Sequence, residues 1–352
     1  MIGQTISHYK ITEKLGEGGM GVVYKAEDLN LGRDAALKFL AREALGDEEH
    51  RERFLREAKA AASLNHPNIC TVYGIHADEE QPFLAMEFVD GEDVKKKVER
   101  GPLDLETALD IAIQAGLGLQ AAHEKGIVHR DIKSANLMAT KQGHVKVADF
   151  GLALVADWSR RTEQNQAPGT PSYMSPEQAM GETVDRRTDV WALGVVLYEM
   201  VTGRLPFEGE YQQAVLYGVI HEQHKPMTAL RVDVPVELDR IVGKALAKGP
   251  DERYQHIDEL LVDLRHLRKQ LSSSKSDAGV QRAVSSPVSL GVDVRSDLAP
   301  QKPAVPMIPT RKLGLHQGLL AVTVMALLVF AFVQLRGATI LHRAERVGIQ
   351  TP

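Results

Sequence analysis

Cysteine is almost absent from this chain of 352 residues, because Cys70 is the only one. A single thiol can form neither an internal disulfide nor a cysteine-rich zinc site. The cysteine content therefore favours a protein whose bulk stays in a reducing compartment such as the cytosol. The first ten residues also lack an apolar run, so we expect no removable signal peptide at this end.

An excess of basic charge is lacking as well. The chain has 42 lysine and arginine residues against 47 aspartate and glutamate residues, for a formal net charge of -5. Nucleic-acid-binding domains usually concentrate positive charge, so no nucleic-acid partner is expected. Hydrophobic residues make up 43% of the chain and charged residues 25%, which is typical of a globular protein with room for about two domains.

The composition changes along the chain. Residues 9–271 are mixed and globular in character. Residues 272–312 are rich in Ser, Pro, Val and Asp and sustain neither a helical nor a strand period, so this stretch is predicted to be a disordered linker. As a flexible coil of roughly 40 residues it would span about 35 Å.

A long apolar run follows the linker. Residues 319–335 read LLAVTVMALLVFAFVQL, in which Thr323 and Gln334 are the only polar residues. A helix needs about 20 apolar residues to cross a bilayer, and the flanking residues lengthen this run, so we predict a single transmembrane helix over 315–338. A buried or interfacial helix is the alternative. Residues 339–352 are then a tail too short to be a folded sensor.

The first part of the globular zone, residues 9–88, carries strand signals. Short β-branched or apolar runs predict strands over 22–26, 35–40 and 83–88. A helix is expected over 48–63. Its apolar stripe at helical spacing consists of Phe54, Ala58, Ala61 and Ala62.

The second part, residues 92–271, has helical patterns instead. Apolar residues recur at helical spacing in the stretches 105–125, 185–201, 234–247 and 257–270. A small β-rich lobe therefore precedes a larger α-helical lobe, which is an α+β, bilobal architecture. A cleft between lobes is a common place for a ligand site.

A glycine-rich stretch, Gly16-Glu17-Gly18-Gly19-Met20-Gly21, precedes the first of these strands. Glycines let a backbone approach phosphate groups closely, and the N–H groups of the loop can then face the anionic oxygens. An ordinary glycine-rich hairpin has the same composition and remains an alternative. A dinucleotide-binding fold is disfavoured, because it requires a helix directly after the glycines, and here Val22-Val23-Tyr24 begins a strand.

Lys38 lies near the end of the second apolar run. Such a lysine points either to solvent or into a cleft. Glu57 lies on the following predicted helix, where its carboxylate could form an ion pair with the Lys38 ammonium. That pair would position Lys38 on the α- and β-phosphates of a nucleotide.

The most specific pattern is His129-Arg130-Asp131-Ile132-Lys133-Ser134-Ala135-Asn136, followed thirteen residues later by Asp149-Phe150-Gly151. Phosphoryl transfer needs a carboxylate to orient an attacking hydroxyl and accept its proton, and Asp131 supplies one. It also needs oxygen ligands for Mg²⁺, which Asn136 and Asp149 supply in the required order.

With these motifs in order, the chain resembles the eukaryotic-type serine/threonine protein kinases, and it is most similar to bacterial receptor-like kinases with a cytosolic N-terminal catalytic domain. The resemblance covers residues 9–271. It implies the bilobal kinase fold, ATP and Mg²⁺ (or Mn²⁺) as cofactors, and proteins as substrates.

The resemblance also implies roles for individual residues. Those that would bind ATP are Gly16, Glu17, Gly18, Gly19, Met20, Gly21, Val23, Ala36, Lys38, Met86, Glu87, Val89, Asp93 and Met138. Among these, Val23, Ala36 and Met138 would sandwich the adenine, Met86 would be the gatekeeper, the backbone of Glu87 and Val89 the hinge, and Asp93 a ribose contact. The catalytic set would be Asp131 as base, Lys133 on the γ-phosphoryl group, Lys38 and Glu57, with Asn136 and Asp149 as metal ligands.

The way in which this family is regulated implies roles for further residues. Arg130 before the catalytic aspartate implies activation by a phosphate on the following loop, because arginine pairs bidentately with phosphate. The candidate phosphorylation sites are Ser159, Thr162 and Thr170, and Thr170 would also contact Asp131 and Lys133. Three residues would be structural: Glu177 and Arg253 as a buried ion pair, and Asp189 as a brace for the catalytic loop. Ser175 departs from the family's usual alanine, and little consequence is expected.

A single-pass protein of the cell membrane with a cytoplasmic kinase domain is the predicted location, because the kinase needs cytosolic ATP. Basic residues flank the apolar run on both sides, so the positive-inside rule does not decide the orientation. Phosphorylation of one copy by another in a homodimer is expected to activate the loop. Two alternatives are a membrane-tethered scaffold whose kinase fold binds partners without turnover, and a kinase of small molecules.

Overall fold

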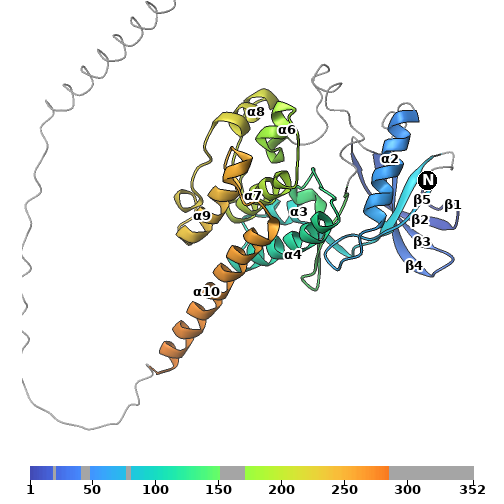
Figure 1. Cartoon of the computed structure of the whole chain (residues 1–352). Coiled ribbons are helices and arrows are strands. Elements are labelled where there is room, and N and C mark those ends of the chain that lie inside the picture. The colour runs from blue at the N-terminus through green and yellow to red at the C-terminus, as the bar shows by residue number, and fades with distance from the viewer. Residues whose placement is uncertain (19–20, 41–47, 77–80, 151–170, 285–352) are drawn as a thin grey trace, which may run out of the picture. The chain divides into compact units, whose positions relative to one another are not determined.

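The chain is described by a computed structural model over residues 1–18, 21–40, 48–76, 81–150 and 171–284 (Figure 1). These residues all belong to one folded unit, Met1–Ser286. Most of the predicted linker, the predicted transmembrane helix over 315–338 and the tail over 339–352 lie outside the described residues, so they stay predictions. None of the helices in the described ranges is long and apolar enough to cross a membrane.

The N-terminal lobe is an antiparallel sheet of six strands in the order β1-β2-β3-β4-β6-β5. The strands are β1 Thr5–Ile6, β2 Tyr9–Gly18, β3 Gly21–Asp28, β4 Arg33–Leu40, β5 Val72–His76 and β6 Phe83–Glu87. The three strands expected from the sequence are β3, β4 and β6. Side chains of the sheet form an apolar cluster that includes Tyr9, Ile11, Leu37 and Phe83.

Helix α2, Glu48–Ala62, packs beside this sheet (Figure 1). Ala58 and Ala61 of the predicted stripe are buried, whereas Ala62 is exposed. Ala58 joins Leu84 and Met86 of β6 in a second apolar cluster. The helix ends before Asn65-His66-Pro67, because proline disfavours the helical conformation in the preceding residue.

The C-terminal lobe is mainly helical (Figure 1). Its helices are α3 Val94–Glu99, α4 Leu105–Glu124, α6 Pro176–Met180, α7 Arg187–Thr202, α8 Gln212–His221, α9 Val236–Ala245 and α10 Ile257–Val284. A small sheet in the order β7-β8-β9 consists of Gly91–Asp93, Leu137–Thr140 and Val145–Val147. The four predicted helices correspond to α4, α7, α9 and α10.

Helix α7 lies at the centre of this lobe, and residues 188–201 are all buried. Its close contact with α9 requires Gly194, since a Cβ there would lie 2.9 Å from the Cβ of Ala245. Trp191 is fully buried and stacks on Phe207, with ring centroids 5.7 Å apart. The lobe therefore has one large core into which α4, α7, α9 and α10 all contribute buried residues.

One boundary differs from the sequence analysis. Helix α10 continues to Val284, so the first part of the predicted linker, residues 272–284, is helical. Neither glycine nor proline interrupts residues 270–278. Serine hydroxyls satisfy carbonyls of the same helix, since Ser272 Oγ donates to the Lys269 carbonyl and Ser273 Oγ to the Gln270 carbonyl, each at 2.9 Å. The stretch lacks an apolar stripe, which is why its periodicity did not indicate a helix.

Candidate active site

The loop that contains Asp131 is held by one buried carboxylate on α7. Asp189 is fully buried, and its Oδ2 and Oδ1 accept hydrogen bonds from the backbone N–H groups of His129 and Arg130, each at 2.8 Å. Arg130 has φ of 68°, a left-handed conformation that is unfavourable for a residue with a side chain. The hydrogen bonds to Asp189 stabilise that conformation and thereby fix the direction of the loop after Arg130.

Asp131, Lys133 and Asn136 then converge at the end of this loop. The Lys133 ammonium lies 2.7 Å from Asp131 Oδ2. Asn136 donates from Nδ2 to the Asp131 carbonyl at 2.8 Å and to Asp131 Oδ2 at 3.3 Å. Because the amide nitrogen of Asn136 faces Asp131, its oxygen is directed elsewhere and can serve as a ligand.

Asp149 follows β9 and joins the two lobes. Its Oδ2 lies 2.8 Å from the ammonium of Lys38, a residue of β4 that is only 5% exposed. Partial burial opposes ionisation of Asp149, but the charge of Lys38 and its hydrogen bond outweigh this and hold the pKa of the carboxyl below its ordinary value. Asp149 also has a positive φ, 64°, so the chain turns sharply at this point.

The sequence analysis expected Glu57 as the ionic partner of Lys38, and the structure places Asp149 there instead. From the sequence alone, either the Glu57 or the Asp149 carboxylate could have been the ionic partner of Lys38. Glu57 lies on α2, whereas Asp149 follows the short sheet of the other lobe. Which of the two meets the ammonium depends on how α2 and the segment after β9 approach β4, which no local pattern reveals.

His129 is fully buried and links the loop to the Asp149 segment. Its Nδ1 accepts from the Asp131 backbone N–H at 3.2 Å, and its Nε2 donates to the Ala148 carbonyl at 2.9 Å. Its ring packs against Phe150 with centroids 4.6 Å apart. The imidazole of His129 therefore positions Asp131, the candidate base, relative to Asp149, a candidate metal ligand.

The glycine-rich stretch forms the hairpin between β2 and β3. Gly18 and Gly21 pair across its end, and Gly21 has φ of 133°, which only glycine adopts readily. Gly19 and Met20 lie outside the described residues. Glu17 is exposed, and its carboxylate forms an ion pair with Lys14 at 2.6 Å.

The predicted adenine residues lie together in part. Val23, Ala36, Met86 and Val89 belong to a single apolar cluster beside the β-rich lobe. Met138 lies on β8, outside that cluster, and pairs with Asp93 across the small sheet.

Two predicted nucleotide contacts already have partners within the protein. Asp93 caps α3 by accepting from the Lys96 N–H at 2.8 Å. The Glu87 N–H donates to the Thr71 carbonyl at 2.8 Å, and its carbonyl accepts from Cys70 Sγ at 3.3 Å. A carbonyl oxygen has two lone pairs, so Glu87 can still accept from a ligand.

Comparison with known proteins identifies this arrangement. The protein kinase domain family matches residues 9–264, which is most of the described chain. This chain belongs to the protein kinase domain family. Its relatives include the serine/threonine-protein kinase PknB of Mycolicibacterium smegmatis, 45% identical over 263 residues, which are 73% of this chain and 42% of PknB. A probable serine/threonine-protein kinase of Clostridium acetobutylicum is 40% identical over 270 residues, 76% of this chain and 41% of that protein.

Solved structures agree with this result. The kinase domain of Mycobacterium tuberculosis PknI has 29% identity and a TM-score of 0.62, over 76% of this chain and 98% of that one. The chain spans about two fifths of the length of the curated relatives that it matches. The bilobal kinase fold predicted from the sequence is therefore confirmed.

The kinase domain buries an ion pair in its helical lobe. Arg253 donates to both carboxylate oxygens of Glu177, each at 2.8 Å, and neither side chain is more than 5% exposed. Ser175 has a larger role than the sequence analysis expected. It caps α6 in a reciprocal hydrogen-bond pattern with Gln178, and its hydroxyl lies 2.6 Å from that of Thr188.

Sequence analysis missed a buried chain of hydrogen bonds beside the catalytic loop. Tyr173 donates to Glu199 Oε2 at 2.7 Å, and its hydroxyl lies 2.8 Å from Ser134 Oγ. Burial raises the pKa of the Glu199 carboxyl, although the bond from Tyr173 opposes the shift. Since a carboxylate only accepts, Tyr173 directs its proton to Glu199 and receives one from Ser134.

Another hydrogen bond to the catalytic loop runs from Gln178 Nε2 to the Arg130 carbonyl at 2.8 Å. The phosphorylation-site candidates Ser159, Thr162 and Thr170 lie outside the described residues.

The donor set suits a hard cation that arrives with a nucleotide. Asn136 offers an amide oxygen and Asp149 a carboxylate, both oxygen ligands of the kind that Mg²⁺ takes. Nowhere in the described ranges do three or more His, Cys, Asp or Glu side chains group into a metal site of their own. Mg²⁺ is commonly bound by one or two protein ligands together with substrate phosphates, so these residues fit it.

Proposed function

We propose that this chain is a serine/threonine protein kinase that transfers the γ-phosphoryl group of Mg·ATP to hydroxyl groups of protein substrates. The observation that carries the proposal is the convergence of Asp131, Lys133 and Asn136 within hydrogen-bonding distance of one another. Asp149 and Lys38 supply the neighbouring metal and phosphate contacts. The relatives named above are serine/threonine-protein kinases, which supports the substrate class.

Each side chain has a physical role in this transfer. The Asp131 carboxylate orients the attacking hydroxyl and accepts its proton, while Lys133, 2.7 Å away, offsets negative charge on the transferred group. Asn136 and Asp149 hold Mg²⁺, which neutralises charge on the phosphates when it is bound. Lys38 binds the α- and β-phosphates, and Gly16, Gly18 and Gly21 cover them with backbone N–H groups.

Activation through the loop that follows Asp149 forms part of the proposal. Arg130 Nε is buried and has no hydrogen-bond partner among the described residues. A guanidinium next to the catalytic aspartate is suited to a phosphate group on the loop, at Ser159, Thr162 or Thr170. The apolar run over 319–335 supports a membrane anchor with the kinase domain on the cytoplasmic side, where ATP is available.

The first test compares the full chain with its Asp131→Asn variant after incubation with labelled Mg·ATP and a protein substrate. Asparagine keeps the size of the side chain but cannot accept the proton, so transfer should fall by at least about a hundredfold. Binding of ATP should stay nearly unchanged, because Asp131 is not a nucleotide contact. Mapping of the label by mass spectrometry identifies the acceptor residues.

Other outcomes would point to the alternatives. Binding of Mg·ATP without transfer to any protein would favour a membrane-tethered scaffold. Transfer only to small hydroxyl compounds would favour a small-molecule kinase. Full activity of the Asp131→Asn variant would remove the role assigned to Asp131.

A further inference from the structure

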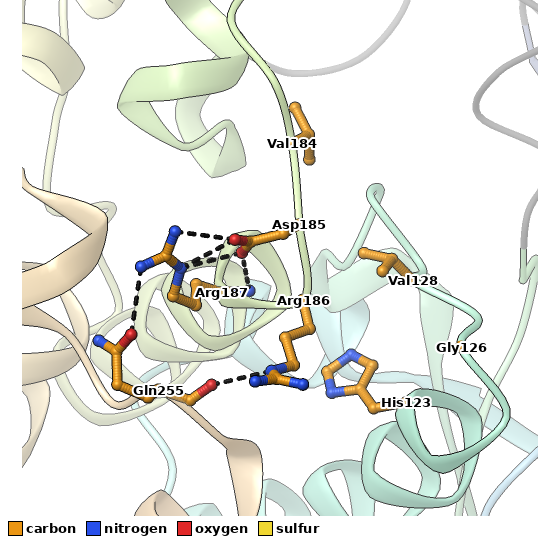
Figure 2. Close-up of a pocket in the computed structure, with 8 residues that line it drawn as sticks. All are labelled: His123, Gly126, Val128, Val184, Asp185, Arg186, Arg187 and Gln255. Carbon is orange, nitrogen blue, oxygen red and sulfur yellow. Dashed lines mark hydrogen bonds and ion pairs between the residues drawn. The ribbon is translucent and has the colours of Figure 1, made fainter.

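A pocket with a volume of about 570 Å³ lies on the helical lobe and shares no lining residue with the active site (Figure 2). Its wall is built from the end of α4, the turn after it, the start of α7 and the segment before α10. The lining residues that matter here are His123, Gly126, Asp185, Arg186, Arg187 and Gln255.

His123 contributes an unpaired buried acceptor to this pocket. Its side chain is 7% exposed, and its Nε2 lies 2.7 Å from Asp189 Oδ2. A carboxylate can only accept, so in the neutral imidazole the proton is on Nε2 and Nδ1 carries a lone pair. Nδ1 is buried and has no hydrogen-bond partner within the described part of the chain. Buried polar atoms are rarely left without a partner, so a donor is expected here.

Arg186 contributes the unbalanced positive charge. Its Nε donates to the Gln255 carbonyl at 3.0 Å, and one terminal nitrogen lies 3.0 Å from His256 Nε2. In the described ranges no carboxylate lies within ion-pair distance of Arg186, which leaves several of its five N–H donors for a ligand. By contrast, Arg187 is neutralised by Asp185 at 2.8 Å (Figure 2). Asp251 forms a second ion pair with it.

These two groups select the chemistry of a ligand. It must donate a hydrogen bond to His123 Nδ1 and present anionic oxygens to Arg186. Ionised carboxylates and sulfate offer acceptors only. A phosphate monoester has a second pKa of about 6, so near that pH it carries both an O–H donor and anionic oxygens. The planar guanidinium of arginine also matches phosphate geometry.

We propose that this pocket is an effector site for a phosphate monoester. A ligand that donates to His123 Nδ1 holds the ring in the position in which its Nε2–H bonds Asp189. Asp189 in turn accepts from the backbone N–H groups of His129 and Arg130. Occupancy of the pocket is thereby transmitted through two hydrogen bonds to the loop that contains Asp131.

The binding experiment uses the full chain at pH 7, with the nucleotide site saturated by Mg²⁺ and a non-hydrolysable ATP analogue. Inorganic phosphate, phosphothreonine, a phosphothreonine peptide and sulfate are titrated by calorimetry. Phosphate and phosphothreonine should bind, and sulfate should bind about tenfold more weakly, because it cannot donate to His123. A peptide that binds more tightly than inorganic phosphate identifies a phosphorylated protein as the source, and the reverse order identifies free phosphate.

The matched variants are Arg186→Gln and, as a control, Arg204→Gln, an exposed arginine outside the pocket. Arg186→Gln should weaken phosphate binding by about tenfold or more, whereas Arg204→Gln should leave it unchanged. A thermal melt that matches the wild type shows that each variant is folded. Equal binding by Arg186→Gln and wild type, or equal binding of sulfate and phosphate, overturns the proposal.

The effector role is tested by peptide phosphorylation at saturating ATP, with and without the phosphate ligand. This arm rests on the proposed kinase activity, which the same assay measures first without the ligand. The ligand should change the rate of the wild type and of Arg204→Gln, and should have no effect on Arg186→Gln. A basal rate that does not respond to a bound ligand overturns the effector role, whereas the lack of any basal rate contradicts the proposed function instead.

Discussion

Individual buried polar groups show how this kinase domain combines stability with a precise site. Asp189 is fully buried, yet three hydrogen bonds, from His123, His129 and Arg130, satisfy its carboxylate. Glu199 is also buried, but it accepts a hydrogen bond from the neutral hydroxyl of Tyr173. A buried carboxylate without a cationic partner resists ionisation, whereas one that receives several N–H groups does not.

Glu199 should therefore make the stability of the domain depend on pH. Burial raises its pKa above the ordinary 4.5, so the folded state holds the proton more tightly than the unfolded state does. Its ionisation costs stability, and that cost grows as pH rises from the unfolded pKa through the folded one. The Glu199→Gln variant cannot ionise at this position. Its free energy of unfolding, measured with urea, should therefore increase relative to that of the wild type as the pH rises from 4 to 8. A difference that is constant over that range would contradict the raised pKa.

Cys70 gives a second prediction at this scale. Burial raises the pKa of its thiol to about 12, and only the thiolate is nucleophilic. A thiol reagent at pH 8 should therefore react with the native chain far more slowly than with the chain unfolded in urea. The sequence has no other cysteine, so the measured rate belongs to Cys70 alone. Equal rates in the two states would show that Cys70 is accessible in the folded protein.

At the scale of elements, the contact between α7 and α9 depends on a residue with no side chain. A Cβ on Gly194 would lie 2.9 Å from the Cβ of Ala245 and 3.3 Å from Leu246 Cδ2. Because Gly194, Ala245 and Leu246 are all buried, the two helices cannot move apart here without opening the core.

Gly194→Ala should lower the free energy of unfolding by about 1–3 kcal/mol, in spite of the better helix propensity of alanine. The matched control is Gly249→Ala, where the nearest atom would be 3.5 Å away and φ is −73°, so little change is expected. Urea denaturation of both variants measures the difference. A Gly194→Ala variant as stable as the control would show that the two helices can separate at little cost.

At the scale of the whole molecule, the proposed loop phosphorylation and the proposed membrane anchor bear on each other. A loop that is phosphorylated by another copy of the chain becomes modified faster as copies are concentrated, and tethering to a membrane raises that local concentration. The rate of loop phosphorylation per molecule should therefore rise with protein concentration, and rise further on lipid vesicles. Mass spectrometry of Ser159, Thr162 and Thr170 over a dilution series measures it. A rate that is independent of concentration would exclude action between copies.

The sequence by itself determined the family and the order of the chemical groups. Asp131, Asn136 and Asp149 occur at spacings that few other functions require, and local patterns located the main strands and helices of both lobes. These features are short-range, since a glycine-rich hairpin, a helix end or a catalytic loop is specified by residues that are close in the chain.

Only the tertiary structure decided which distant groups meet. It paired Lys38 with Asp149 rather than Glu57, placed His123 on Asp189 and joined Tyr173 to Glu199. His123 and Asp189 are 66 residues apart, and their contact depends on how α4 and α7 pack in the core. Such pairs leave no periodic signal in a single sequence, because either residue alone is an ordinary polar side chain on a helix. The helical residues 272–284 were missed for a related reason, since a helix without an apolar stripe has no pattern to read.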